Sequence, residues 1–199
     1  MTEVVHSHLE GGVLTLTLDS PKNRNALGAA LVEQLRNGLR EAETNADVRA
    51  VVLTHAGGTF CAGADLSEAL AGGASVQEAS AIGTGAMLDL MRTILELPKP
   101  VIAKINGHVR AGGFGLVGAA DIALAGPACT FALTESRLGL APSVISLVLL
   151  PKMTARASGR YFLSGESFDR QTAVRIGLIT ESFATTDDLD AGADTVLAG

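Results

Sequence analysis

Two adjacent glycines, Gly112 and Gly113, lie between a short β-branched run and a small apolar run, and this arrangement could bind an anion. Residues 101–105 are predicted to be a buried strand, and residues 114–120 a helix packed in the core. A turn between a strand and a helix leaves backbone N–H groups free at the helix start, where they carry partial positive charge. Such a terminus can hold an anion or a developing oxyanion. Glycine pairs also serve close packing alone, so this stretch leaves both interpretations open.

A second passage follows the same plan earlier in the chain. Residues 49–54 are a β-branched run that predicts a buried strand, and the glycine-rich residues 55–66 then open a helix. The sequence therefore places two glycine turns at the ends of two buried strands.

Strands and helices alternate along the rest of the chain. Leucines at every fourth position from Leu27 predict an amphipathic helix, which Asn25 is expected to cap. A helix over residues 76–97 carries Met87 and Met91 on one side, a pattern more typical of a core than of a ligand pocket. Further strands are predicted at residues 4–8, 13–18, 121–125 and 130–133. Residues 138–150 are expected to turn through Gly139 and Pro142 into an apolar helix, and more helices are predicted at 154–163, 169–176 and from 187 onward. This pattern indicates an α/β fold with helix-covered sheets, and no linker divides residues 1–199 into two domains.

Composition excludes several classes of protein. Hydrophobic residues make up 47% of the 199 and charged residues 18%, as in a globular domain. The net charge of −6 and the lack of a basic patch argue against a nucleic-acid partner. No apolar run reaches the length of a membrane span, and the N-terminus does not resemble a signal peptide. We therefore expect a cytoplasmic protein.

Cysteine and histidine give no sign of a metal site or a nucleophile. Cys61 and Cys129 lack metal-ligand spacing, and no two of the four histidines have the helical spacing of a metal site. Cys61 has no evident base partner, so we do not interpret it as a nucleophile.

Three segments, taken in order, resemble the crotonase superfamily, also called the enoyl-CoA hydratase/isomerase family. They are residues 60–66 (FCAGADL), residues 106–121 with their glycine pair, and residues 131–135 (FALTE) followed by Gly139 and Pro142. Residues 21–27 (PKNRNAL) are similar to the early substrate loop of that family. The resemblance covers nearly the whole chain.

The resemblance implies a fold, a substrate class and a set of site residues. It implies a spiral of repeated β-β-α units with C-terminal helices, assembled as a homotrimer or a dimer of trimers. It implies an acyl-CoA substrate, with coenzyme A carried as part of that substrate and no other cofactor. The N–H groups of Ala64 and Gly112 would form an oxyanion hole for a thioester enolate. The CoA-binding residues would be Lys22, Arg24, Ala62, Gly63, Ala64, Asp65, Leu66 and Gly112.

One departure from the family pattern bears on the reaction. Typical hydratases of the family have one glutamate at the position of Gly115 and a second at that of Glu135. Here the resemblance leaves Glu135 alone as the expected catalytic acid/base. Hydration activates a water at Cβ and delivers a proton at Cα, work that two carboxylates divide. A single glutamate at this position also resembles the double-bond isomerases of the family.

We therefore carry three hypotheses. The first is an enoyl-CoA hydratase, a lyase, that uses Glu135, Ala64 and Gly112, and the second is an enoyl-CoA isomerase that uses the same residues. The third is a scaffold that binds acyl-CoA or a protein partner with little catalysis. Family members usually continue with further helices, so residues 1–199 are expected to lack part of the C-terminal helical region, either because the chain is unusually short or because its end is missing.

Other side chains near the motifs have two interpretations each. Arg110 either meets a substrate carboxylate or CoA phosphate, or makes a salt bridge or subunit contact, and the second is favoured. His108 is expected to be an ordinary loop histidine. Asp65 is expected to cap the helix that starts there, and Asp121 to fix a turn or a subunit contact.

Overall fold

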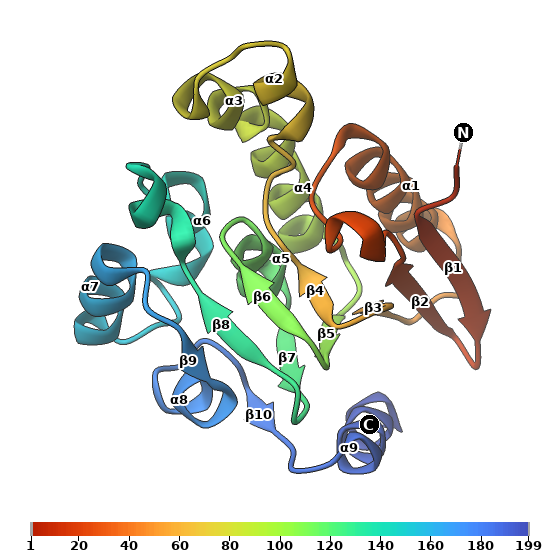
Figure 1. Cartoon of the computed structure of the whole chain (residues 1–199). Coiled ribbons are helices and arrows are strands. Elements are labelled where there is room, and N and C mark those ends of the chain that lie inside the picture. Colours follow the sequence, from red (N-terminus) through yellow and green to blue (C-terminus); the bar gives the residue numbers. More distant parts are fainter. Residues whose placement is uncertain (1, 199) are drawn as a thin grey trace.

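The fold consists of two β-sheets and the helices that surround them (Figure 1). The computed structural model describes residues 2–198, apart from the side chains of residues 68, 69, 79, 80 and 82. Within this range the larger sheet has the spatial order β1 (Val5–Glu10), β2 (Val13–Leu18), β3 (Ala50–His55), β5 (Val101–Ile105), β7 (Ile122–Ala125) and β10 (Glu181–Ser182). The smaller sheet has the order β4 (Thr59–Cys61), β6 (His108–Arg110), β8 (Thr130–Ala132) and β9 (Phe168–Asp169).

From β3 to β8, successive strands alternate between the two sheets, and helical segments connect the repeats. β3, β5 and β7 lie side by side in the larger sheet, and each is followed by a strand of the smaller one. The helical segments are η1 (Pro21–Asn23), α1 (Ala29–Thr44), α2 (Ser67–Ala71), α3 (Val76–Ile82), α4 (Thr84–Glu96), α5 (Gly113–Ala119), η2 (Thr134–Leu138), α6 (Ser143–Leu149), α7 (Ala155–Ser164), α8 (Arg170–Arg175) and α9 (Thr186–Ala198). The predicted spiral of β-β-α units with C-terminal helices is confirmed.

The core forms where helix faces cover the larger sheet. Alternating residues of β2 are buried, and α1 buries Leu31, Leu35 and Leu39 on the side that faces the sheet. Gly38 permits close contact, because an added Cβ would lie 2.6 Å from a methyl carbon of Leu16. On the opposite face α9 packs Leu189 and other apolar residues against β3, β5 and β7. No helix in the described part of the chain is both long and apolar enough to cross a membrane.

Two predictions about helices are wrong. The helix predicted over residues 76–97 is divided at Gly83, which ends α3 and begins α4, and glycine is a poor residue for a helix interior. Asn25 does not cap α1, since that helix begins at Ala29 behind Gly28 and has no side-chain cap. Asn25 is instead fully buried, with a left-handed backbone (φ 54°).

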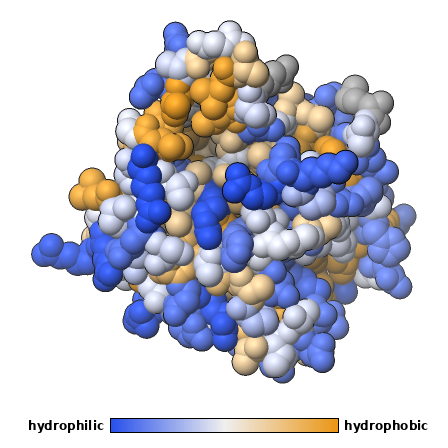
Figure 2. Space-filling view, viewed as in Figure 1, coloured by the Kyte–Doolittle hydropathy of each residue, from blue (hydrophilic) through white to orange (hydrophobic). Residues whose placement is uncertain are grey.

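Apolar and polar residues are separated on one face of the molecule. Figure 2 shows hydrophobic residues gathered over α2 and α3, and hydrophilic ones across the middle of the same face. Leu70 of α2 is one of the exposed large apolar side chains.

Candidate functional site

The two predicted N–H donors, on Ala64 and Gly112, lie in neighbouring turns. β4 and β6 run parallel in the smaller sheet, so the chain leaves both strands at the same edge. An added Cβ at Gly63 would lie 2.8 Å from the Gly112 nitrogen, so the two turns are in close contact. Neither N–H donates to an acceptor within residues 2–198, and both residues line one cavity. The structure therefore offers two unpaired backbone donors together, as an oxyanion hole requires.

Both turns contain a residue with a positive φ angle, which sets the direction of the chain there. Gly63 has a φ of +89°, which L side chains rarely adopt, and Ala111 has a φ of 44° directly before Gly112. Strained non-glycine residues of this kind cluster at functional sites. The Ala111 N–H donates to the carbonyl of Ala132, which fixes the turn against β8.

Asn25 holds the first turn in place, and sequence reasoning missed this role. Its amide nitrogen donates to the carbonyls of Ala56 and Thr59, and its amide oxygen accepts from the N–H of Ser20. The chain then continues to Leu27, whose N–H donates to the carbonyl of Gly63 over 2.7 Å. A buried, fully bonded asparagine thus ties residues 20–27 to the segment that presents Ala64.

Glu135 follows β8 and leaves the smaller sheet at the same edge as Gly112. Arg110 of β6 pairs with Ala132 of β8, two residues before Gly112 and three before Glu135. Glu135 is partly buried, and its Oε2 has no hydrogen-bond partner within the described residues. Burial raises the pKa of this carboxyl to about 7. A carboxyl with this pKa can accept and return a proton near neutral pH.

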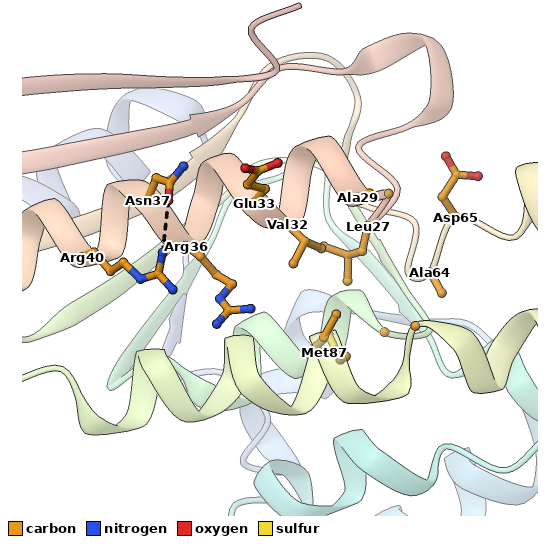
Figure 3. Close-up of a pocket in the computed structure, with 14 residues that line it drawn as sticks. Leu27, Ala29, Val32, Glu33, Arg36, Asn37, Arg40, Ala64, Asp65 and Met87 are labelled. Carbon is orange, nitrogen blue, oxygen red and sulfur yellow. Dashed lines mark hydrogen bonds between the residues drawn. The ribbon is translucent and has the colours of Figure 1, made fainter. Parts of the chain in front are cut away.

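A cavity of about 610 Å³ opens between α1 and α4 and reaches both N–H donors (Figure 3). The described residues that line it are Leu27, Gly28, Ala29, Val32, Glu33, Arg36, Asn37, Arg40, Ala64, Asp65, Gly83, Ala86, Met87 and Gly112. Glu135 is not among them. Met87 was predicted as part of a core stripe, of which Leu90, Met91 and Ile94 are buried, while Met87 itself faces this cavity.

The predicted CoA-binding residues surround the first turn. Lys22 and Arg24 are exposed, and Ala62 and Leu66 are partly buried. Asp65 lines the cavity, but its carboxylate accepts from the N–H and hydroxyl of Ser67 and from the amide of Asn23. These hydrogen bonds lower the pKa of Asp65. Asp65 therefore supports the start of α2, as predicted.

His108 and Arg110 lie in strand β6, and the prediction that they lie in a loop is wrong. The Arg110 guanidinium donates to the carbonyls of Val109 and Thr130 and to the hydroxyl of Thr130. It has no carboxylate within ion-pair distance in the described chain, so the favoured salt bridge is absent there. Burial, and then the charges of Arg137 and Arg24, lower its pKa. Arg110 connects β6 to β8.

Two further predictions agree with the structure. The Cys61 thiol is fully buried, and burial raises its pKa to about 12, which disfavours the nucleophilic thiolate. The Asp121 carboxylate accepts from the N–H of Val101 and fixes the start of β5.

Similarity to known proteins assigns the family. Residues 8–197 match the enoyl-CoA hydratase/isomerase family. The chain belongs to this family, which is also known as the crotonase superfamily.

Individual members of the family show similarity along the chain. An enoyl-CoA hydratase structure from Mycobacterium avium is 52% identical, with a TM-score of 0.87 over 100% of this chain and 76% of that one. The 1,2-epoxyphenylacetyl-CoA isomerase of Escherichia coli K12 is 33% identical over 90% of this chain and 69% of its own length. The probable enoyl-CoA hydratase EchA14 of Mycobacterium tuberculosis H37Rv is 38% identical, over 83% and 64%. The chain thus spans about two thirds of the length of these curated relatives.

Within the crotonase fold, Gly115 on α5 makes room for Met87. An added Cβ at Gly115 would lie 2.1 Å from the Met87 Cε, 2.9 Å from the Met91 Sδ and 3.0 Å from the Ile145 Cγ2. Side chains from α4 and α6 therefore fill the space where the resemblance predicts a second glutamate in typical hydratases. Any side chain at position 115 requires Met87 to move.

Proposed function

We propose that this crotonase-superfamily protein acts on acyl-CoA thioesters through an enolate, and that its reaction is the migration of a double bond. The proposal rests on two observations taken together. Glu135 supplies one carboxyl, and apolar side chains fill the space at Gly115, where typical hydratases of the family have a second glutamate. Isomerisation needs a single group that moves one proton, whereas hydration divides its work more naturally between two.

In this scheme the thioester oxygen accepts hydrogen bonds from the N–H groups of Ala64 and Gly112. The Glu135 carboxylate takes a proton from Cα of a 3-enoyl-CoA, and the electron pair of that C–H bond moves to the thioester oxygen. The resulting acid returns the proton to Cγ, and the product is a 2-enoyl-CoA. Each preorganised donor contributes about 3 kcal/mol to such a step, because the negative charge develops on the oxygen that it faces.

Hydration of a 2-enoyl-CoA is the second candidate, and the names of relatives favour it. The Mycobacterium avium structure, 52% identical, is described as an enoyl-CoA hydratase. Glu135 would then both activate the water that adds to Cβ and supply the proton to Cα. No step of either scheme uses a cofactor other than the coenzyme A of the substrate. The residues named for CoA remain those around Ala62 to Leu66, with Lys22 and Arg24.

The test offers the purified chain a 3-enoyl-CoA and, separately, a 2-enoyl-CoA. Isomerisation predicts that the conjugated thioester absorbance appears from the first substrate. It predicts no 3-hydroxyacyl-CoA from the second. Glu135→Gln is expected to lower turnover by at least about 100-fold, whereas Glu41→Gln, on an exposed part of α1, should retain it.

Other outcomes separate the alternatives. Loss of 2-enoyl absorbance with formation of a 3-hydroxyacyl-CoA, and no conversion of the 3-enoyl substrate, would establish hydration instead. Tight acyl-CoA binding with no turnover of either substrate, unchanged by Glu135→Gln, would identify a binding scaffold.

A further inference from the structure

The cavity between α1 and α4 is mostly apolar at one end and carries two arginines at the other. Near the N–H donors its walls include Leu27, Ala64 and Met87, together with Asp65, whose carboxylate is bound by Ser67 and Asn23. Along α1 the lining continues with Val32, Arg36 and Arg40, which recur at every fourth residue and so share one face of the helix. From Ala29 to Arg36 the helix rises by roughly 10 Å. A chain bound at the donors would therefore meet the arginines only after crossing an apolar stretch.

The two arginines, Arg36 and Arg40, make only long contacts with polar side chains of the protein. Arg36 is 30% exposed, and its guanidinium lies 3.9 Å from the Asp89 carboxylate, which is itself 61% exposed. Arg40 donates to the Asn37 side chain over 3.4 Å. Figure 3 shows Arg36 pointing from α1 into the space beside α4, whereas Glu33 points away from it. Glu33, Arg36 and Arg40 all line the cavity, so two cations of α1 are accompanied there by one carboxylate.

We propose that the acyl group of the substrate ends in a carboxylate that Arg36 binds, with Arg40 as the second cation. The substrate is then a dicarboxylic acid of medium length joined to coenzyme A at one end. This inference rests on the proposed function, because it uses the thioester position at Ala64 and Gly112. A guanidinium binds a carboxylate through two parallel hydrogen bonds, and the apolar walls match the methylene chain between the two ends.

The acyl group fits this end of the cavity better than coenzyme A does. The CoA moiety is expected along residues 62–66, near Lys22 and Arg24, before the start of α1. Met87, which covers Gly115 on the active-site helix α5, lines the cavity on the other side. With the thioester at the donors and Cα to Cγ beside Glu135, which does not line the cavity, the proposal places only the distal part of the acyl chain along α1 toward Arg36.

A binding experiment tests the inference without requiring turnover. Adipyl-CoA and hexanoyl-CoA have equal chain lengths and differ in the terminal carboxylate, and calorimetry gives the affinity of the full chain for each. We expect adipyl-CoA to bind about 10- to 100-fold more tightly, as a charge-assisted contact provides. Arg36→Gln should remove most of that preference, and Arg40→Gln a smaller part. Arg92→Gln, an exposed α4 arginine paired with Glu96, is the matched control and should retain it.

Three results would overturn the inference. One is an equal affinity of the unmodified chain for both thioesters. Another is an equal loss of affinity for both in Arg36→Gln, which would place Arg36 at the CoA moiety. A third is loss of the preference in the Arg92→Gln control. If adipyl-CoA binds selectively but neither enoyl substrate is turned over, the proposed reaction fails while the carboxylate site stands.

Discussion

Glu135 combines a buried carboxylate oxygen that has no partner among the described residues with a pKa near neutrality, and both follow from its position at the end of β8. Since the carboxylate must be ionised to remove a proton from Cα, kcat/KM for the 3-enoyl-CoA should fall as the pH drops through about 7. Rates measured from pH 5 to 9 will show this. A flat profile down to pH 5 would show that Glu135 titrates as an ordinary carboxyl or is not the base.

The same raised pKa has a consequence for stability. Between its ordinary value of 4.5 and about 7, the folded state holds the proton more tightly than the unfolded state does. The free energy of unfolding therefore falls as the pH rises through this window, by an upper bound of about 3 kcal/mol. Glu135→Gln removes the ionisation, so this variant should be more stable than the parent at pH 8 and similar to it at pH 4.5.

Urea unfolding at the two pH values measures the effect. Glu41→Gln is the control for loss of a negative charge, and it should show little change at either pH. Equal stability of Glu135→Gln and the parent at pH 8 would contradict the assigned burial effect.

At the scale of elements, the contact of α4 with α5 excludes a side chain at position 115. Gly115→Glu is expected to destabilise the fold by about 1–3 kcal/mol, because the new side chain must displace Met87. Combining it with Met87→Ala should recover much of this loss and raise the ratio of hydration to isomerisation, since the pair of carboxylates is then complete. Unfolding curves and product analysis of the single and double variants give both quantities.

Gly85→Ala provides the matched control on α4. An added Cβ there meets nothing within 4 Å, so this change should be neutral or stabilising by up to about 1 kcal/mol. If the effects of Gly115→Glu and Met87→Ala simply add, the two positions do not compete for the same space.

The elements that sequence could predict are those with a strong local pattern. The alternation at β2 and the leucine repeat of α1 specify their own structure, and the glycine turns specify where Ala64 and Gly112 lie. The break at Gly83 was missed because the apolar stripe continues across it. Asn25 was misassigned because its partners, Ala56 and Thr59, lie more than 30 residues away. Met87 and Arg36 line the cavity because α1 packs beside α4, and no local sequence pattern predicts that packing.

At the scale of the molecule, the site depends on how the two sheets are connected, because β3, β5 and β7 of the larger sheet each lead into a strand of the smaller one. Parallel strands β4, β6 and β8 end at one edge, and each is followed by one part of the site: Ala64, Gly112 and Glu135. Residues 20–27 reach the same edge through Asn25. The site therefore draws on segments from four consecutive repeats, and a ligand bound there would contact all four of these segments.

A ligand that contacts so much of the fold should stabilise all of it. At a free concentration about 100 times its Kd, hexanoyl-CoA is expected to raise the free energy of unfolding by about 2.7 kcal/mol, or the Tm by roughly 5–10 °C. Gly63→Ala should remove most of this gain, because its Cβ would lie 2.8 Å from the Gly112 nitrogen and separate the two donors. Gly73→Ala has a similar φ of +90° but no neighbour within 4 Å, so it imposes a comparable backbone strain and should retain the gain. Melting curves with and without hexanoyl-CoA decide the matter, and an equal ligand shift in both variants would show that the thioester does not bind at the Ala64 and Gly112 turns.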